Sequence, residues 1–397
     1  MRKSRVRTLL KWLGANLCRL LLAVTFVFSG IVKLIDPRGT QYKIEDYTIY
    51  LNLDAFLPQG GALVLALALA LLEFYVGLSL FFGIRRRTTT RLALALMVVM
   101  TPLTFYLAWT NAHMDCGCFG DAVVLTNWQT FGKNLILLLA AVTVTYSYRR
   151  LTRFITERNQ WLLLLYSMVF ALFLGIYSIR HLPVFDFRPY RIGVDLPKAI
   201  AEEWEGDGTE MKYSDFSIQS MDGEDITFSW LGQEGYKFLL VAPDLEHADD
   251  GTMDCINALY DYCQEEGYAF LALTSSLEES IDRWRDLTGA EYDFAQTDGT
   301  VLKTVVRSNP GLLLLHDGVI YRKWAANDLS EVESLTEPLE NLRIGQLQEH
   351  RRARAVIRLL LWFLVPLFVW TLVDRIWLVS KFYKRYKIHK ELNIRKT

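Results

Sequence analysis

Two cysteines separated by one glycine are the residues of this chain with the clearest capacity for chemistry. Cys116 and Cys118 flank Gly117 in the stretch HMDCGCFGD, which contains no lysine or arginine. A disulfide between them would close a small, strained ring, and the glycine supplies the unusual backbone angles that such a ring requires. Because strained disulfides are reduced more readily than relaxed ones, the pattern predicts a dithiol–disulfide pair suited to exchange.

Three other interpretations of this stretch stay open. The two thiols could be packed side chains that cap the preceding apolar helix, or the stretch could be a partner-binding loop without chemistry. It could also bind a metal with His113 and Asp115, although two thiols one residue apart rarely both ligate one zinc ion, and we therefore expect no metal. A protonated His113 would stabilise a thiolate, and Asp115 would act in the opposite sense.

The remaining cysteines do not suggest a disulfide scaffold. The chain has five cysteines, an odd number, which excludes complete pairing within the chain. Cys255 and Cys263 fall in one predicted helix, where eight residues separate Cα atoms by about 12 Å along the axis. That distance exceeds the roughly 7 Å limit for a disulfide. We therefore interpret them as small core residues.

Long apolar stretches predict a membrane protein. The composition is 52% hydrophobic and the net charge is −1, which gives no electrostatic case for nucleic-acid binding. A transmembrane helix needs about 20 mostly apolar residues. No small-residue cleavage site follows the first stretch, so we favour a retained helix over a cleaved signal peptide. Six stretches qualify: Trp12–Leu34, Gly61–Ile84, Leu92–Thr110, Phe131–Tyr148, Trp161–Ile179 and, most weakly, Val356–Ser380.

The distribution of basic residues predicts the orientation. Lysine and arginine gather before the first stretch, after the second, after the fourth and in the tail. Cytoplasmic loops carry such an excess. We therefore expect a multi-pass protein of a bacterial inner membrane with both termini in the cytoplasm. The Cys116 and Cys118 loop and the segment 181–354 would then share the outer face, while the basic cluster at 351–354 fits this orientation poorly.

Glu73 is the one charged residue in the second apolar stretch. A carboxylate inside a span is expensive and usually faces the bundle interior or a proton path. Its neighbours Ala70 and Gly77 are small and predict a closely packed helix beside it. Glu73 is a candidate proton acceptor, and the structural alternative is an ion pair with Arg19 or Lys33.

The polar segment after the fifth apolar stretch has the pattern of an α/β domain. Strands are predicted at 225–230, 237–243 and 268–273, helices at 253–266, 277–287 and 329–342, and a β-hairpin at 311–324 around an Asp-Gly turn. This order is similar to that of a thioredoxin-like fold. Asn309-Pro310 lies where that fold places its cis-proline.

That domain lacks one element of a thioredoxin-type enzyme. The helix after its first central strand should begin with Cys-x-x-Cys, and the corresponding stretch reads VAPDLEHADDGTMDC. We therefore expect no dithiol chemistry of its own. Lys303, Arg307, Asn309 and Pro310 are candidate partner-binding residues, and a solvated strand edge leading into a turn is the alternative interpretation.

The stretch FSGIVKLIDPRGTQYKIEDY, the helix around Glu73 and the motif DCGCFGD together resemble the DoxX/MauE family. This family comprises four-helix bacterial membrane proteins tied to thiol or quinone redox work. The bundle resemblance covers residues 12–150, and the whole chain is similar to a DoxX-type architecture of Bacteroidetes-like bacteria with a C-terminal thioredoxin-like domain. MauE-type members are linked to maturation of a disulfide-rich methylamine dehydrogenase subunit, and other DoxX members are subunits of a thiosulfate:quinone oxidoreductase.

The resemblance implies the following organisation: a four-helix membrane domain over 1–150, a fifth helix and connector over 151–185, an extracytoplasmic thioredoxin-like domain over 186–350, and a sixth helix with a basic cytoplasmic tail over 351–397. It implies a membrane redox-associated protein, and from the Cys-Gly-Cys motif we hypothesise that Cys116 and Cys118 relay thiol–disulfide electrons between a membrane quinone and an envelope protein. The alternative is a non-enzymatic scaffold whose degenerate thioredoxin-like domain binds an envelope protein. We expect the lipid bilayer as a partner and no nucleic acid.

Overall fold

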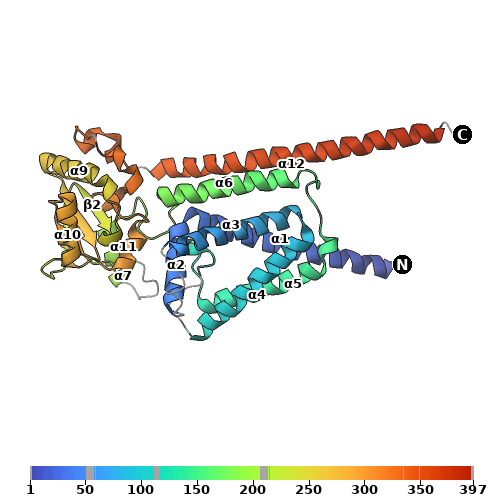
Figure 1. The fold of residues 1–397 in the computed structure, drawn as a ribbon, viewed down its shortest axis with the longest axis horizontal. Coiled ribbons are helices and arrows are strands. Elements are labelled where there is room, and N and C mark those ends of the chain that lie inside the picture. Colours follow the sequence, from blue (N-terminus) through green and yellow to red (C-terminus); the bar gives the residue numbers. More distant parts are fainter. Residues whose placement is uncertain are drawn as a thin grey trace. The chain divides into compact units, whose positions relative to one another are not determined.

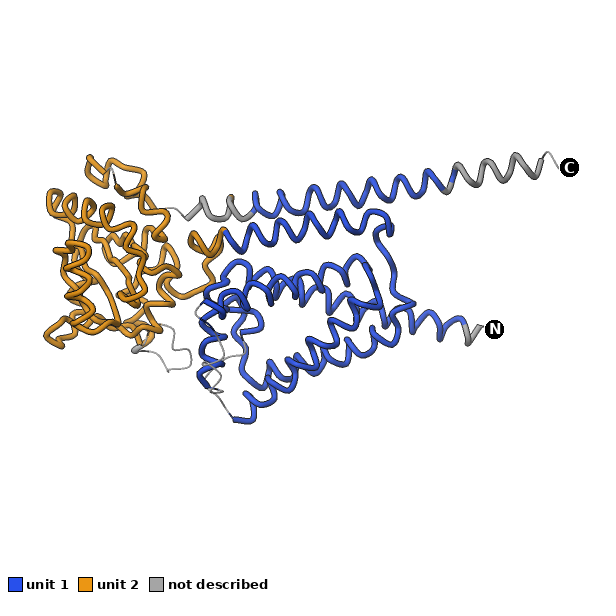
Figure 2. The backbone as a smooth tube through the Cα atoms, in the orientation of Figure 1, with its two compact units in different colours: residues 1–176, 357–397 blue, residues 177–356 orange. Residues whose placement is uncertain are grey.

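The chain folds into a helical unit and a mixed α/β unit (Figure 1). The computed structural model describes residues 2–50, 58, 60–110, 117–205, 213, 215–333, 335–347 and 349–394. The first unit contains residues 1–176 and 357–397, and the second contains residues 177–356 (Figure 2).

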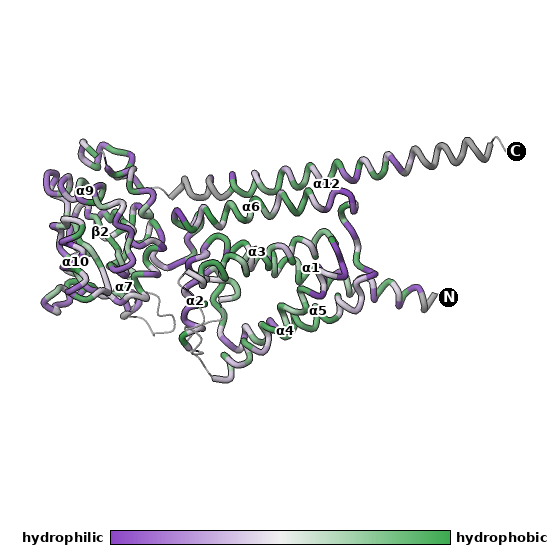
Figure 3. The backbone as a smooth tube through the Cα atoms, viewed as in Figure 1, coloured by the Kyte–Doolittle hydropathy of each residue, from purple (hydrophilic) through white to green (hydrophobic). Residues whose placement is uncertain are grey.

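Long helices form the first unit. They are α1 (Arg2–Ile35), α2 (Pro37–Tyr50), α3 (Gly61–Phe82), α4 (Arg86–Thr110), α5 (Asn127–Tyr146), α6 (Gln160–Arg180) and α12 (Glu349–Ile394), with short 3-10 turns η2 (Gly120–Ala122) and η3 (Tyr148–Arg150) between them. Hydrophobic residues dominate α3 and α6 in Figure 3.

Five described helices are long and apolar enough to cross a membrane: α1, α3, α4, α6 and α12. They correspond to five of the six predicted spans, and the chain is a multi-pass membrane protein. The predicted span Phe131–Tyr148 does form a helix, α5, but α5 is not among the five. It begins with Asn127-Trp-Gln-Thr and carries Lys133 and Asn134 in its first half, which lowers its hydropathy.

Glycines bring the backbones of α1 and α3 into direct contact. A Cβ atom at Gly30 would lie 2.6 Å from the backbone nitrogen of Phe74, and one at Gly77 would lie 2.5 Å from the backbone nitrogen of Val27. No real Cβ atom is accommodated at such distances, so both positions require glycine. The closely packed helix predicted beside Gly77 is therefore α1.

Helix α12 runs antiparallel to α6. Just past the middle of α12, Asp374 accepts hydrogen bonds from the backbone N–H of Thr156 (3.0 Å), its hydroxyl (2.5 Å) and the amide of Asn159 (2.6 Å), just before α6 begins. Farther along, the hydroxyl of Tyr166 donates to the carbonyl of Trp362 (2.6 Å). Asp374, the carboxylate that makes the sixth span less apolar, is therefore buried, and both of its oxygens accept hydrogen bonds.

The C-terminal part of α6 packs against α3 and the C-terminal end of α1. A Cβ atom at Gly175, close to the C-terminal end of α6, would lie 2.6 Å from Leu67 Cδ1 and 3.1 Å from Leu34 Cδ2. Leu34 is next to the last residue of α1. The C-terminal ends of α1 and α6 therefore lie together.

The second unit is built on one six-stranded sheet. The strands are β1 (Gln219–Ser220), β2 (Tyr236–Ala242), β3 (Ala269–Thr274), β4 (Phe294–Gln296), β5 (Gly311–His316) and β6 (Val319–Ala325), and the order is β1-β4-β3-β2-β5-β6. Strands β2, β3 and β4 are parallel, and β5 and β6 form an antiparallel hairpin beside β2.

Helices cover this sheet. They are α7 (Leu196–Glu205), α8 (Thr227–Leu231), α9 (Met253–Glu266), α10 (Glu278–Thr288) and α11 (Gly299–Val305), with 3-10 turns η4 (Leu245–His247), η5 (Asp250–Thr252), η6 (Ala326–Glu331), η7 (Leu339–Asn341) and η8 (Arg343–Gly345). Alternate residues of the buried strand β2 contribute to two separate hydrophobic cores: Phe238 and Leu240 pack with α9 and α10, and Leu239 and Val241 with α7, α8 and α11. The peptide bond between Asn309 and Pro310, just before β5, is cis. The unit is a thioredoxin-like fold, as predicted.

Two predicted elements of this unit are wrong. The segment 225–230 was predicted as a strand but contains helix α8, because the Asp225 carboxylate accepts the backbone N–H of Thr227 (2.8 Å) and starts a helical turn. The predicted helix 329–342 is replaced by the short turns η6, η7 and η8, since Pro338 precedes η7 and interrupts any longer helix. The hairpin is confirmed, with positive φ at both Asp317 (50°) and Gly318 (79°).

A buried ion network ties the connector before α7 to the sheet. Asp186 accepts hydrogen bonds from Arg188 Nε (2.8 Å) and Lys323 Nζ (3.2 Å), and Lys323 also donates to the carbonyl of Val305 (2.7 Å) at the end of α11. Burial alone would raise the pKa of the Asp186 carboxyl, but the charges of Lys323 and Arg188 outweigh it and hold that pKa far below its ordinary value.

Candidate functional site

The loop between α4 and α5 carries Cys118 in a conformation that depends on glycine. Gly117 and Gly120 have φ angles of 59° and 53°, in the left-handed region. A Cβ atom at Gly117 would also lie 2.5 Å from Lys43 Cδ on α2. The glycine that was predicted to permit a tight Cys-Gly-Cys turn therefore suits the local backbone, and a larger residue there would also have to displace the side chain of Lys43.

Three residues of the predicted site lie outside the described residues: Cys116, His113 and Asp115. Their interactions with Cys118 stay predictions, including the disulfide and the metal alternative. Within the described part of the chain, no group of three or more histidine, cysteine, aspartate or glutamate side chains is placed to hold a metal ion.

A buried ammonium group joins the Cys118 loop to α1 and α3. Lys33 Nζ donates to Glu73 Oε2 (2.6 Å), Ser29 Oγ (2.8 Å) and the backbone carbonyl of Cys118 (3.1 Å). These three bonds use all three hydrogens of the ammonium. Lys33 is 3% exposed and Glu73 is 5% exposed, so the ion pair is shielded from solvent. Of the two partners proposed for Glu73, Lys33 is the one that contacts it.

Ser29 provides the shortest connection between Glu73 and the loop. Its hydroxyl oxygen lies 2.7 Å from Glu73 Oε2 and 2.5 Å from the carbonyl oxygen of Cys118. A hydroxyl has one hydrogen, so it donates to one of these acceptors at a time while it accepts from Lys33. One side chain thus stands between the buried carboxylate and the backbone of the cysteine.

Arg19, the other partner considered for Glu73, lies near the middle of α1 and contacts a different segment. Its guanidinium donates to the carbonyl of Thr152 and lies over the ring of Phe154, 4.9 Å from the centroid. Asn16, one turn earlier, accepts the backbone N–H of Thr152 (3.1 Å). Arg19 therefore anchors the segment that leads to α6.

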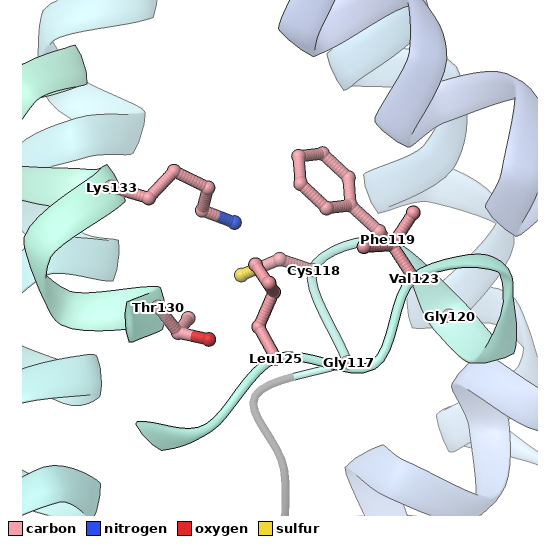
Figure 4. Close-up of a pocket in the computed structure, with 8 residues that line it drawn as sticks. All are labelled: Gly117, Cys118, Phe119, Gly120, Val123, Leu125, Thr130 and Lys133. Carbon is pink, nitrogen blue, oxygen red and sulfur yellow. The ribbon is translucent and has the colours of Figure 1, made fainter. Parts of the chain in front are cut away.

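The side chain of Cys118 lines a small pocket beside α5. Figure 4 shows its sulfur on the side of the pocket toward which the Lys133 ammonium also points. Lys133 Nζ lies 3.9 Å from the ring centroid of Phe119, and Phe119 packs edge-on against Phe28 of α1 (5.3 Å). The pocket is lined by Gly117, Cys118, Phe119, Gly120, Val123, Leu125, Thr130 and Lys133.

Besides Lys33, two further lysines lie near this loop, and they differ in their partners. Lys43 of α2 pairs with Asp121 at 3.3 Å. Lys133 of α5 has the Phe119 ring as its close partner, and no described carboxylate lies within salt-bridge distance of it. Its positive charge is thus available to the pocket into which Cys118 points.

The cysteines of the second unit are core residues. Cys263 is completely buried, and burial raises the pKa of its thiol to about 12. Cys255 packs against the same core, and its thiol pKa is raised by burial and then by the neighbouring carboxylates, Glu333 first. Both thiols therefore resist ionisation, and the absence of dithiol chemistry in this unit stays a prediction.

The candidate partner-binding residues of the second unit lie on and after α11. Arg307 is 6% exposed and donates to the carbonyl of Lys303 (2.6 Å), one turn before it. The amide of Asn309 donates to the carbonyl of Asp244 (2.6 Å), and Pro310 is buried. The alternative of a strand edge is wrong for Lys303, which lies in helix α11. A partner-binding role stays a prediction.

Sequence reasoning missed two residues of the site. Ser29 lies one helical turn before Lys33, a spacing that places both on one face of α1 and could have been noticed. Lys133 lies in the second turn of α5, far from Cys118 in sequence, and nothing local marks it as part of the pocket.

The chain resembles known proteins in two comparisons. Residues 10–147 match the family model described as methylamine utilisation protein MauE, a range that contains α1 to α5, Glu73 and the Cys118 loop. The search of curated proteins gives no match. Among solved structures, the chain is similar to one described as a "putative protein disulfide isomerase" from Bacteroides thetaiotaomicron, with 16% identity, a TM-score of 0.26, and coverage of 30% of this chain and 81% of that one.

Proposed function

We propose that this protein, whose residues 10–147 match the MauE family model, performs thiol–disulfide exchange at the extracytoplasmic face of the membrane through Cys116 and Cys118. The observation that carries the proposal is the fixed position of Cys118. Its carbonyl is bound to the buried Lys33 and Ser29, and its sulfur points into a separate pocket with a basic group. Such a placement holds a thiol for reaction instead of burying it in a core.

The proposed reaction is balanced, because the envelope protein's disulfide is the oxidant. The two thiols of Cys116 and Cys118 become one disulfide, and an envelope protein's disulfide becomes two thiols. Two electrons move from the cysteines to the partner's sulfurs, and two protons pass between the thiols through solvent. The reverse reaction would oxidise the partner and leave the loop reduced.

A membrane quinone is the proposed electron acceptor when the exchange runs in reverse: the envelope protein's thiols reduce the Cys116–Cys118 disulfide, and the quinone then oxidises the dithiol again. Transfer from the dithiol would give a disulfide and a quinol, so that two electrons and two protons leave the cysteines together. Glu73 is the proposed proton acceptor, supported by its position one hydroxyl away from the Cys118 backbone. No described cavity is assigned to the quinone.

The proposed orientation draws support from the helical unit. Gly175 of α6 packs against Leu34 of α1, close to the end of α1 that holds Lys33 and the Cys118 loop. The chain enters residues 177–356 directly after this end of α6. With the basic segments in the cytoplasm, the loop and the thioredoxin-like unit would both be extracytoplasmic.

The second candidate function is a scaffold. The thioredoxin-like unit has no Cys-x-x-Cys, and its two cysteines resist ionisation. This observation favours a role in which the unit binds an envelope protein without transferring electrons. The two proposals agree on the unit itself and differ on the chemistry of the Cys118 loop.

Alkylation of intact membranes followed by mass spectrometry tests the exchange proposal. We expect a Cys116–Cys118 crosslink under oxidising conditions and two alkylated thiols after reduction. Cys18→Ser, on α1 and outside the loop, is the matched control and should leave the crosslink unchanged. Two thiols that stay fully alkylated under oxidising conditions would favour the scaffold.

A membrane-impermeant thiol reagent tests the orientation in whole cells. We expect it to label Cys118 from the outside in a Cys116→Ser variant. Labelling that requires permeabilised cells would place the loop in the cytoplasm and remove the envelope partner from the proposal.

A further inference from the structure

We propose that Cys118 is the attacking sulfur of the pair, and that Lys133 is the positioning residue whose ammonium stabilises its thiolate. This inference rests on the proposed exchange function and deepens it, because it assigns different roles to the two cysteines. Cys116 becomes the resolving thiol.

The backbone of Cys118 fixes the direction of its side chain. Its carbonyl oxygen accepts hydrogen bonds from Lys33 Nζ (3.1 Å) and Ser29 Oγ (2.5 Å), both on α1. The φ angle of Gly117 (59°) sets the chain direction just before it. The carbonyl is therefore held on the α1 side, and the sulfur lies in the pocket on the α5 side (Figure 4).

The pocket would disfavour a thiolate without a nearby positive charge. Phe119, Val123 and Leu125 contribute apolar side chains to its lining, and these offer a charged sulfur neither a hydrogen bond nor a compensating charge. Lys133 supplies the missing charge, because it lines the same pocket and its ammonium lies 3.9 Å from the Phe119 ring centroid. A cation beside a cysteine favours the nucleophilic thiolate.

Lys133 of α5 is the lysine near the loop that fits the role of stabilising the thiolate. Lys43 is also close to the loop, but the carboxylate of Asp121 at 3.3 Å offsets its charge. Lys33 is likewise paired with Glu73 at 2.6 Å and lies on the carbonyl side. Of the three lysines around the loop, Lys133 combines a location in the sulfur's pocket with a charge that no described carboxylate neutralises.

The proposed sequence of bonds follows from this assignment. The Cys118 thiol gives its proton to water, and its thiolate attacks one sulfur of the partner's disulfide. That S–S bond breaks, a Cys118–partner bond forms, and the second partner sulfur leaves as a thiolate and takes a proton. The Cys116 thiolate then attacks the Cys118 sulfur, closes the Cys116–Cys118 disulfide and releases the second partner thiol. The cysteines lose two electrons, and the partner's disulfide gains them.

The rate of alkylation of Cys118 by N-ethylmaleimide tests the role of Lys133. It is measured from pH 6 to 9 in the full-length Cys116→Ser protein, in membranes. We expect Lys133→Gln to slow alkylation at pH 7 by roughly fivefold or more and to move the pH profile to higher pH, because the thiolate loses its stabilising charge. Lys133→Arg should restore the rate and the profile. Lys43→Gln, the matched control, should change neither.

Trapping of mixed disulfides tests the division of roles. We expect Cys116→Ser to accumulate a disulfide between Cys118 and its envelope partner, and Cys118→Ser to accumulate none. A pH profile unchanged in Lys133→Gln, or trapping confined to Cys118→Ser, overturns the inference. Alkylation that depends on Lys133, without trapping in either variant, supports the assignment of Lys133 and overturns the exchange function.

Discussion

Lys33 of α1 and Glu73 of α3 form a buried ion pair in which Nζ and Oε2 are 2.6 Å apart. Each charge is compensated only while the other is present, because neither side chain reaches solvent. Together with Ser29 and the Cys118 carbonyl, the pair joins two helices and one loop at a single point.

Breaking this pair from one side should destabilise the helical unit strongly. Removing one partner of a buried ion pair typically costs about 3–5 kcal/mol, because it leaves an unpaired charge. We therefore expect Lys33→Met or Glu73→Met to lower the thermal unfolding midpoint in detergent, and the double variant to lose less than the sum of both. A double variant whose loss equals that sum would show that the two charges are not coupled.

Ser29→Ala should loosen the Cys118 loop without removing a charge. The variant loses the hydroxyl that bridges Glu73 and the Cys118 carbonyl, and we expect a loss of about 1–2 kcal/mol in the free energy of unfolding. Alkylation of Cys118 should become faster, since the carbonyl is held by one bond instead of two. Thr25→Ala, one turn earlier on α1, removes a hydroxyl that donates only to Leu21 of its own helix (2.9 Å) and is the control. Equal effects of both substitutions would argue against the bridge.

The contact between α1 and α3 should not tolerate a methyl group at Gly30 or Gly77. A Cβ atom there meets backbone atoms at 2.6 and 2.5 Å, so alanine must push the helices apart. We expect Gly30→Ala and Gly77→Ala to cost about 1–3 kcal/mol or more, measured as thermal stability in detergent. Gly14→Ala and Gly132→Ala are matched controls, since nothing lies within 4 Å of their Cβ positions. Destabilisation by the controls alone would contradict the packing described.

Stability of the thioredoxin-like unit should fall in acid through Asp186. Its pKa is lowered in the folded state by Lys323 and Arg188, so below its ordinary value, about 4, the unfolded chain binds a proton that the folded chain does not. The stabilisation is thus present above about pH 4 and declines as the pH falls further. Pulse proteolysis of the whole protein with pepsin, from pH 5 down to 2, measures this as faster cleavage within β5 and β6. In Asp186→Asn the unit should be less stable at pH 5 and lose less on further acidification. If stability declined with pH identically in Asp186→Asn and in the unsubstituted protein, Asp186 would not be a source of the acid destabilisation.

Hydropathy and turn chemistry predicted most of this fold because they act locally. Apolar length placed α3 and α6 within a few residues, and the Asp317-Gly318 turn placed the hairpin. The three-residue strand β4 was missed, because it is fixed by pairing with β3 and β1 and has no periodicity of its own.

The candidate site was predicted only in part for the same reason. The glycine between the two cysteines and the carboxylate in a span are visible in sequence, since each is unusual where it stands. Lys133 and the Ser29 bridge depend on helices that meet across the bundle, and no local pattern encodes that meeting.

The hydrogen bonds of Asp374 set an order on the biogenesis of this protein. Its partner Thr156 precedes it by 218 positions, so the ribosome delivers the start of α6 long before the helix that satisfies it. Throughout synthesis of residues 177–356, that part of the bundle stays unfinished. A chain that stops before α12 would therefore leave Thr156 and Asn159 without the carboxylate that accepts their hydrogen bonds.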